Sequence, residues 1–369
     1  MVEKLMKNIC FIIKVTNNYG GAERRFARLI NYISNDKRYK ISVILVGESS
    51  NTKKFKAEYL INKNINIFEI NNNIKVLALI PKLNVDIIHF ITVNTSFIFL
   101  YTNLKLIKKN CELILSLNSY DLCLGEYKNI LQKITFQKLL KIVNKIDCLY
   151  PSYIENVKKI SQEISTSKDL KIFYPENSFT DLDKFQPSDN KNKVIVFASR
   201  LIAQKNPVLA IKSINECRTI IRANNYKVIF AGGGPLYSNL EEYIKNHNLE
   251  DIVKMTGNVD LSNILPKSRI FLSLQEMENY PSQSLLEAIS SGNYIIASDV
   301  GDTKRIIDEN FGMLTNLKLA ELVDRLVEAI KFTNDSKKMS EISTRSREFA
   351  IKNFKISSYA EHIKEIWSQ

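Results

Sequence analysis

The sequence of 369 residues has no long apolar run. A membrane-spanning helix needs roughly 18 consecutive apolar residues, and no segment approaches that length. Basic residues precede the short apolar run Ile9–Ile13, which superficially suggests a signal peptide. Because this run is shorter than a secretory core and no small-residue cleavage site follows it, we expect a first buried strand instead.

Histidine and cysteine are also scarce. There are only three histidines, and the five cysteines are odd in number and lack metal-ligand spacing, so neither a disulfide framework nor a zinc site is expected. This cysteine usage favours a reducing cytoplasm. The cysteines are Cys10, Cys111, Cys123, Cys148 and Cys217.

Negative charge is in deficit, because 52 Lys and Arg stand against 39 Asp and Glu and give a net charge of +13. Such an excess favours anionic partners, namely nucleic acid, an anionic membrane surface or phosphorylated substrates. The alternative is a general bias toward Lys, Asn and Ile. Nucleic acid is disfavoured because the basic residues are dispersed and no recognition motif accompanies them.

The pattern of apolar runs predicts two doubly wound α/β domains in series. Strand-like runs alternate with amphipathic stretches before and after a polar, turn-rich segment, and the length exceeds what one core usually organises. We therefore expect a first domain over 1–178, a linker over 179–192, a second domain over 193–352 and a final helix over 353–369 that packs back on the first domain. In such sheets ligands bind outside the carboxyl ends of the strands.

One segment of the first domain has two interpretations. The stretch from Asn129 to Lys145 is basic and amphipathic. It could lie on anionic lipid, but a half-buried domain helix with a solvated lysine face is favoured.

Two glycine-rich turns follow predicted strands. In "NNYGGAERR", Gly20 and Gly21 would let the backbone approach a ligand at a helix N-terminus that favours negative charge, although a double glycine is often only a turn. "FAGGGP" lacks the Lys-Ser/Thr of a P-loop, so ATP binding of that kind is not supported.

The loop "SRLIAQKNP" carries two cations after a buried strand. Arg200 and Lys205 have no acidic neighbour in this stretch, which suits the charge of a departing diphosphate. The alternative is a pair of exposed cations.

In "ENYPSQSLLEAI", Asn279 and Pro281 mark a helix start whose free N–H groups can face an anion. Glu287 lies about two turns inside and could accept hydrogen bonds from a ribose diol, although Glu is also a good helix former. Asp181 and Asp183 form an Asp-x-Asp pair, but we reject it as a metal site because no buried strand precedes it.

Taken in order, these motifs resemble the retaining, nucleotide-sugar-dependent glycosyltransferases of family 4, which have the GT-B fold. The resemblance runs nearly the whole chain through "GGAERR", "SRLIAQKNP", "AGGGP", "MTG", "ENYPSQSLLEAISSG" and "SDVGDT". It implies an α/β chain of two Rossmann-like domains that face each other across a cleft, with the acceptor on the first and the donor on the second.

The resemblance also implies roles for individual residues. Arg200 and Lys205 match the diphosphate-binding pair, Glu287 matches the ribose-binding glutamate, and Gly21 matches the glycine loop near the phosphates. It implies no metal and no cofactor. The further residues that it places at the donor are Gly20, Gly257, Glu278, Tyr280, Pro281 and Ser282.

Two departures from the family pattern affect the sugar contacts. Where the family has Glu, seven residues and Glu, this chain has Asn279 at the first position and Glu278 one residue before it. Asn118 stands where many relatives have a histidine after a strand. Asn118, Asp121 and His89 remain candidate sugar or acceptor contacts, although a lone histidine after a strand is more often structural.

The expected function is transfer of a sugar, with retention, from a nucleoside diphosphate sugar to a saccharide or lipid-linked acceptor. Family relatives suggest a peripheral protein of the inner membrane face that serves polysaccharide, lipopolysaccharide or glycolipid assembly. The alternatives are a sugar-nucleotide epimerase of the same fold and a non-catalytic carbohydrate- or membrane-binding relative.

Overall fold

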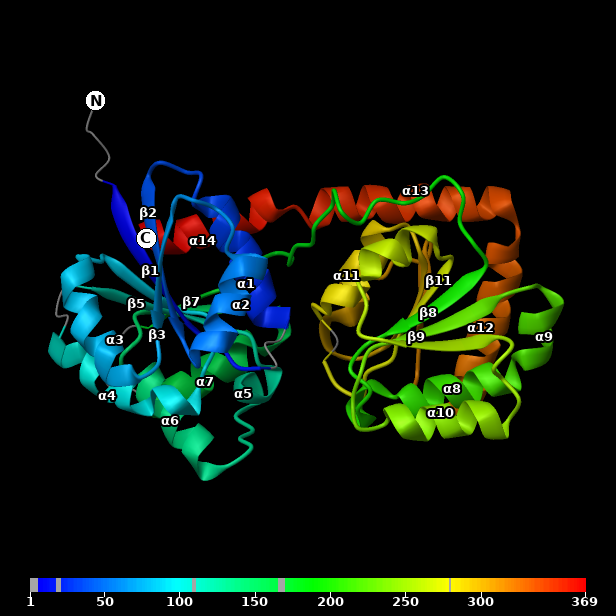
Figure 1. The fold of residues 1–369 in the computed structure, drawn as a ribbon, viewed down its shortest axis with the longest axis horizontal. Helices are drawn as coiled ribbons and strands as arrows, with labels where there is room; N and C mark the ends of the chain where they lie inside the picture. The colour runs from blue at the N-terminus through cyan, green and yellow to red at the C-terminus, as the bar shows by residue number, and fades with distance from the viewer. Residues whose placement is uncertain (1–5, 18–20, 108–110, 165–169, 279) are drawn as a thin grey trace. The chain divides into compact units, whose positions relative to one another are not determined.

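The computed structural model divides the chain into two α/β units and describes residues 6–17, 21–107, 111–164, 170–278 and 280–369. Unit 1 comprises Met1–Glu176 and Ile356–Gln369, and unit 2 comprises Asn177–Lys355 (Figure 1). The chain therefore enters unit 2 after Glu176 and returns to unit 1 at Ile356. The expected helix over 353–369 corresponds to α14 (Ile356–Ser368), which packs against α1 and β6 of unit 1.

Unit 1 is built on a seven-stranded sheet with the order β3-β2-β1-β4-β5-β6-β7. All of its strand pairs are parallel, as the alternation of apolar runs and amphipathic stretches predicts. Its strands are β1 (Lys7–Lys14), β2 (Tyr39–Val46), β3 (Ile65–Ile70), β4 (Ile87–Phe90), β5 (Glu112–Leu117), β6 (Lys145–Cys148) and β7 (Lys171–Phe173).

The helices of unit 1 cover its sheet, and α3, α4 and α6 lie next to one another (Figure 1). The helix expected over 129–145 is shorter than predicted. It begins after the capping side chain of Asn129 and ends at Leu140, because Lys145 already starts β6. The helices are α1 (Gly21–Ile33), α2 (Ser49–Tyr59), α3 (Asn73–Leu79), α4 (Ile98–Ile107), α5 (Tyr120–Leu124), α6 (Ile130–Leu140) and α7 (Ile154–Ile164), with 3-10 turns η1 (Ile80–Leu83), η2 (Thr95–Phe97) and η3 (Pro151–Tyr153).

Unit 2 has a six-stranded parallel sheet with the order β10-β9-β8-β11-β12-β13. The chain starts at β8 in the middle, builds toward β10 on one side and then builds toward β13 on the other. The strand order therefore reverses between β8 and β11. The strands are β8 (Val194–Ala198), β9 (Lys227–Ala231), β10 (Val253–Gly257), β11 (Ile270–Ser273), β12 (Tyr294–Ser298) and β13 (Gly312–Thr315).

Helices cover both faces of the unit 2 sheet. α8 contacts α10 and α12, whereas α11 contacts α13 (Figure 1). The helices are α8 (Pro207–Glu216), α9 (Arg218–Ala223), α10 (Tyr237–Asn246), α11 (Gln283–Ser290), α12 (Leu319–Asn334) and α13 (Ser336–Asn353), with 3-10 turns η4 (Ala203–Lys205), η5 (Leu261–Asn263), η6 (Leu265–Lys267) and η7 (Gly301–Arg305).

The segment 179–192 has no helix or strand but is packed against unit 2. Phe179 and Phe185 are buried, and the Ser188 N–H donates to the Pro266 carbonyl at 3.0 Å. These contacts give the segment a fixed path along the unit that it precedes.

The five cysteines are all free thiols. In the described part of the chain, no helix combines the length and the apolar character that crossing a bilayer would demand.

Candidate active site

Two loops of unit 2 meet where its strand order reverses. The loop after β8 holds Arg200 and Lys205, and the loop after the neighbouring strand β11 leads into α11. The Glu276 N–H donates to the Gln204 carbonyl at 3.2 Å, and the Ser284 hydroxyl donates to the Ala198 carbonyl at 3.0 Å. The reversal of an open α/β sheet is where ligands of this architecture bind, so these loops form the candidate site.

Lys205 is half-buried at the end of η4. Its ammonium group contacts the side-chain oxygen of Gln275. The backbone N–H of Gln275 donates to the Ser298 hydroxyl at 3.0 Å. Burial, followed by repulsion from Arg200, lowers the pKa of Lys205 to about 8. Arg200 is exposed. The site therefore has one permanent cation and one whose charge depends on pH near neutrality.

A glycine turn after β9 supports the Arg200 loop. The Leu201 N–H donates to the Gly233 carbonyl at 2.9 Å. A Cβ at Gly232, whose φ is +136°, would lie 1.9 Å from the Ser199 carbonyl oxygen. The turn needs glycine for this close approach of two backbones. Gly257 ends β10, where its carbonyl accepts the Gly232 N–H at 2.7 Å.

Glu278 is buried and joins two loops of unit 2. Its carboxylate accepts the Tyr280 N–H at 2.8 Å and the Asp302 N–H at 3.1 Å to either oxygen. The same carboxylate lies against Gly301, where a Cβ would be 2.0 Å from an oxygen. Glu278 therefore organises the loops that follow β11 and β12. The other residue of this pair, Asn279, lies outside the described residues, as does Gly20.

The residues that lead into α11 are fixed by local hydrogen bonds. Tyr280 is buried and its hydroxyl accepts the Ser178 N–H at 2.8 Å. Pro281 and Ser282 are half-buried, and the Ser282 hydroxyl pairs with that of Ser284 at 3.3 Å.

Glu287 is a buried residue of α11, which begins at Gln283. Because an exposed helical glutamate would be the simplest alternative, its burial supports the interpretation that its carboxylate has a specific partner.

In unit 1, Asn118 follows β5 and ties three segments together. Its amide donates to the Ile91 carbonyl at 2.5 Å, and its oxygen accepts a hydrogen bond from Arg25 of α1 at 2.6 Å. Asp121 lies in the first turn of α5 and hydrogen-bonds Tyr120, whose pKa is raised first by burial and then by this contact. Gly21 is the first residue of α1.

His89 does not fit the suggested role of a sugar or acceptor contact, because it is 0% exposed in the core of unit 1. Its Nε2 lies 2.9 Å from the Ser116 hydroxyl, and the Trp367 indole N–H donates to its Nδ1 at 3.3 Å. Burial lowers its pKa to about 4, so it is neutral near pH 7. His89 therefore has a structural role in the core of unit 1.

Sequence reasoning missed Gln275 and Ser284, which fix the loops around Lys205. Ser284 lies inside "ENYPSQSLLEAI", but its residue type gave no reason to assign it a role. Gln275 lies three residues before this motif, and its only signal is that the residues between a strand end and such a helix lie beside the site.

The described residues contain no group of three or more His, Cys, Asp or Glu side chains that could hold a metal ion. Within the rejected Asp-x-Asp pair, the Asp181 carboxylate instead accepts the backbone N–H of Lys184 at 3.0 Å.

Residues 178–349, which cover most of unit 2, match the family Glycosyl transferases group 1. This part of the chain belongs to the group 1 glycosyltransferases. This assignment agrees with the resemblance to the retaining enzymes of family 4 and shows that the protein is a transferase.

The glycosyltransferase is 26% identical over 383 residues to a Campylobacter jejuni relative, GalNAc-alpha-(1->4)-GalNAc-alpha-(1->3)-diNAcBac-PP-undecaprenol alpha-1,4-N-acetyl-D-galactosaminyltransferase. That alignment covers 98% of this chain and 97% of the relative.

Solved structures of GT-B proteins share its fold. HepE of Anabaena, in complex with UDP and glucose, has a TM-score of 0.75 at 16% identity and covers 98% of this chain and 99% of its own. The pneumococcal O-GlcNAc transferase GtfA, in complex with UDP and GlcNAc, has a TM-score of 0.73 at 13% identity and covers 98% of both chains. The glycosyltransferase therefore has the GT-B class of fold.

Proposed function

We propose that this glycosyltransferase transfers a sugar from a nucleoside diphosphate sugar to an acceptor hydroxyl with retention of the anomeric configuration, and needs no metal ion. The observation that carries the proposal is the pair Arg200 and Lys205, at the carboxyl end of β8 beside the reversal in strand order. Cations at this edge suit the diphosphate of the donor.

The proposed chemistry breaks the bond between the anomeric carbon and the diphosphate oxygen. Arg200 and Lys205 stabilise the negative charge that develops on the leaving diphosphate, and the sugar passes through an oxocarbenium-like state. The acceptor oxygen forms the new bond to the anomeric carbon and passes its proton to the departing diphosphate oxygen, which leaves as part of the nucleoside diphosphate. Glu287 accepts hydrogen bonds from the ribose hydroxyls. No carboxylate is assigned as a nucleophile, so the proposal includes no covalent intermediate.

Replacement of both cations tests the proposal. Arg200→Ala with Lys205→Ala should lower turnover by about 100-fold or more, because preorganised charge at a leaving group contributes on that scale. Turnover is measured as release of nucleoside diphosphate, with folding checked by circular dichroism. Lys212→Ala, at an exposed position of α8, is the matched control. Near-normal turnover in the folded double variant would overturn the assignment.

The Campylobacter jejuni relative supports a proposal about the donor and acceptor classes. Its name specifies an N-acetyl-D-galactosaminyl group and an acceptor on PP-undecaprenol. We propose a nucleotide-linked N-acetylhexosamine as donor and a lipid-diphosphate-linked saccharide as acceptor, in cell-surface polysaccharide or glycolipid assembly. A panel of nucleotide sugars should raise the melting temperature only where the donor binds the native state.

A lipid-linked acceptor favours a peripheral position on the inner face of the cell membrane, and unit 1 has a surface that suits it. Ile130, Leu131 and Ile134 of α6 are exposed, Ile130 by 69%, and Phe99 of the contacting helix α4 is exposed as well. We call these four residues the apolar surface. Lysines accompany it along the same part of the chain, at Lys128, Lys133, Lys138 and Lys141. Apolar residues beside lysines are typical of a helix that lies on anionic lipid.

A further inference from the structure

Unit 2 has a cavity of about 570 Å³ that the proposed donor site does not use. Lys191 lies just before β8, and Arg269 directly precedes β11. Both residues are therefore at the amino ends of strands whose carboxyl ends lead to Arg200 and the loop before α11. Since parallel strands present these ends at opposite edges of a sheet, the cavity is separate from the proposed donor site.

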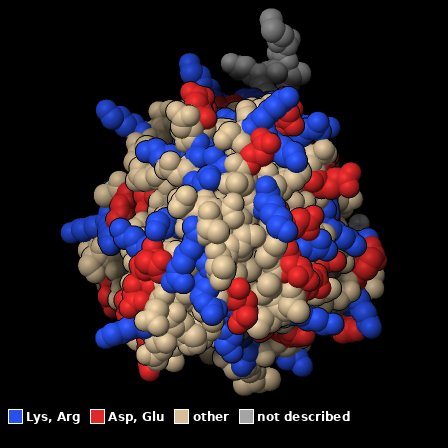
Figure 2. All heavy atoms as spheres, turned by 90° about the vertical axis from the view of Figure 1, so that its right-hand side faces the viewer, with Lys and Arg blue, Asp and Glu red and all other residues tan. Residues whose placement is uncertain are grey.

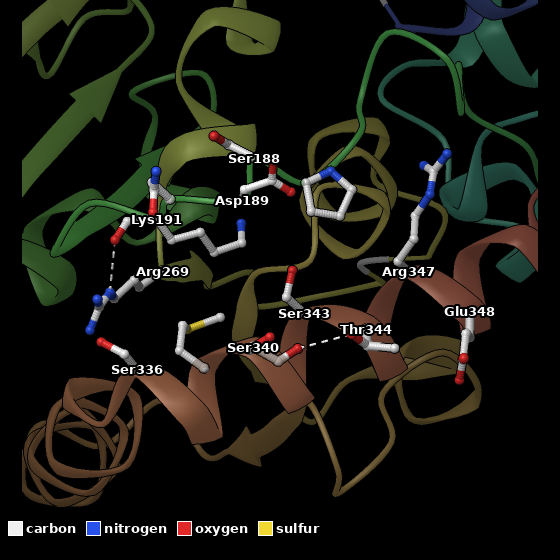
Figure 3. Close-up of a pocket in the computed structure, with 13 residues that line it drawn as sticks. Ser188, Asp189, Lys191, Arg269, Ser336, Ser340, Ser343, Thr344, Arg347 and Glu348 are labelled. Atoms are coloured by element: carbon white, nitrogen blue, oxygen red, sulfur yellow. Dashed lines mark hydrogen bonds between the residues drawn. The ribbon is translucent and has the colours of Figure 1, made fainter.

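Three cations line this cavity, together with hydroxyl groups of α13 (Figure 3). Lys191 lies between Arg269 and Arg347 in this view. The hydroxyls on the α13 wall belong to Ser336, Ser340, Ser343 and Thr344.

Lys191 is held by neutral partners alone. Its ammonium group donates to the carbonyls of Pro266, Ser268 and Ser291 at 3.1, 2.9 and 2.7 Å. Burial, followed by repulsion from Arg269, lowers its pKa to about 7. The carbonyls fix its position without supplying a compensating negative charge.

The two arginines also have neutral hydrogen-bond partners. Arg269 is buried and donates to the carbonyls of Lys191 and Thr333 at 3.1 and 2.6 Å. Arg347 donates to the Phe185 carbonyl at 3.0 Å and to the Ser290 hydroxyl at 2.8 Å. Burial lowers the pKa of Arg347, and Asp183 offsets part of this effect from a distance.

Among the residues that the structure describes, none of these three cations forms an ion pair. The acidic residues of the lining, Asp189 and Glu348, are exposed. Burying a cation without a compensating anion costs free energy, and Lys191 and Arg269 also repel each other. An anion in the cavity would relieve both costs.

We propose that this cavity binds a phosphate-bearing small molecule. The Lys191 ammonium group already donates to three carbonyls, so it attracts a phosphate through its charge alone. Arg347 can donate hydrogen bonds to the phosphate oxygens, and the hydroxyls of α13 can bond the polar remainder of the ligand. The volume lies within the range of about 300–1,000 Å³ that small-molecule sites occupy. A sugar phosphate has both chemical features, the anionic group and the hydroxyls.

The test uses the full chain with Arg200→Ala and Lys205→Ala, which removes the proposed diphosphate contacts at the other edge of the sheet. Inorganic pyrophosphate and glucose 6-phosphate are titrated separately, and binding is followed by calorimetry and by the melting temperature. We expect saturable binding of at least one probe. Preference for glucose 6-phosphate would identify a sugar phosphate as the ligand, and preference for pyrophosphate would identify the phosphate groups alone as the recognised feature.

A carboxylate introduced into the cavity wall should compete with an anionic ligand for the same cations. Ser340→Glu places a carboxylate on the exposed α13 wall and should weaken binding at least tenfold. Lys352→Gln changes the net charge equally at an exposed position of α13 that does not line the cavity, and should leave binding unchanged. Arg347→Gln, with its fold checked by circular dichroism, should weaken binding as well.

Two results would overturn the proposal. One is that neither probe shows saturable binding, either by calorimetry or by the melting temperature. The other is equal binding in Ser340→Glu and Lys352→Gln. Both outcomes are independent of the donor site, because loss of turnover in Arg200→Ala and Lys205→Ala is measured separately.

Discussion

Lys205 shows how one buried amine can make donor binding depend on pH. A lysine buried beside Arg200 loses its proton more easily than a lysine in water, and its pKa falls to about 8. A bound diphosphate would favour the charged form and raise that pKa again. Binding should therefore take up a proton when the free enzyme is above pH 8.

Donor affinity should consequently fall as the pH rises above about 8. Below that value Lys205 is already charged, and above it each unit of pH adds the cost of protonating the amine, up to about tenfold in affinity. Calorimetric titration with the donor nucleotide from pH 7 to 10 measures this. Lys205→Arg keeps a permanent charge and should flatten the profile, whereas an unchanged slope in this variant would assign the dependence to another group.

The Glu278 carboxylate stabilises two loops by accepting hydrogen bonds from backbone N–H groups. Glu278→Ala would leave the N–H groups of Tyr280 and Asp302 without this acceptor, at a cost of about 1–3 kcal/mol in the free energy of unfolding. Chemical denaturation measures the loss, and Glu276→Ala at the exposed neighbouring site is the control. Equal stability of the two variants would contradict the loop-organising role.

At the scale of elements, α14 closes a buried polar chain in unit 1. The Ser116 hydroxyl, which pairs with His89, donates to Asp147 at 2.9 Å. Tyr359 and His362 of α14 also reach Asp147, at 3.3 and 2.8 Å. The helix is therefore held by specific polar contacts as well as by its buried apolar face.

This chain of contacts should make unit 1 sensitive to acid. The folded state holds His89 neutral with a pKa of about 4, below its value of about 6.5 in the unfolded chain. Stability is thus complete above pH 6.5 and falls as the pH approaches 4, by on the order of 3 kcal/mol. Urea unfolding at successive pH values measures this. In His89→Gln the fall over this interval should be much smaller, and a fall as large as that of the unchanged protein would exclude His89 as its source.

Continuous apolar runs alternating with amphipathic stretches allowed most elements of both units to be predicted. The strands β3, β7 and β13 had no comparable signal in the sequence. "NICFIIKV" and "KVIVFAS" form the buried strands β1 and β8 because continuous apolar runs are typical of parallel sheets covered on both faces. β3, β7 and β13 lie at sheet edges, where fewer neighbours need apolar side chains.

The candidate site was predictable as a set of loops but not in its internal contacts. Loops after β8 and β11 follow from strand order, and this order follows from the α/β pattern. The contact of Lys205 with Gln275 and the inward turn of Glu278 depend on how separate loops pack. No spacing in the sequence encodes that packing.

At the scale of the whole molecule, the net charge of +13 is not gathered into one block on the face shown in Figure 2, where basic and acidic side chains are interspersed. This distribution agrees with the alternative that much of the net positive charge comes from a general bias toward lysine. Membrane attraction would then depend on the apolar surface of α6 and α4 as well as on net charge.

Removing that surface should weaken vesicle binding. Ile130→Ser, Leu131→Ser and Ile134→Ser together should reduce co-sedimentation with phosphatidylglycerol vesicles by at least tenfold, since each buried apolar side chain contributes about 1.5–3 kcal/mol. Phosphatidylcholine vesicles should bind weakly throughout. Ile61→Ser, at another exposed site of unit 1, is the control. Equal binding by the triple variant and this control would contradict the proposed surface.

The return of the chain from unit 2 to unit 1 has a consequence for synthesis on the ribosome. Strands β4 to β6 emerge long before Tyr359, His362 and Trp367, so the α14 partners of His89 and Asp147 arrive only after unit 2 has been made. Unit 1 therefore cannot complete its core until α14 has been made, and the polar groups that α14 will bury stay hydrated until then. Unit 2 can complete its own core earlier. The order of translation is thus the reverse of the order in which the two cores can close.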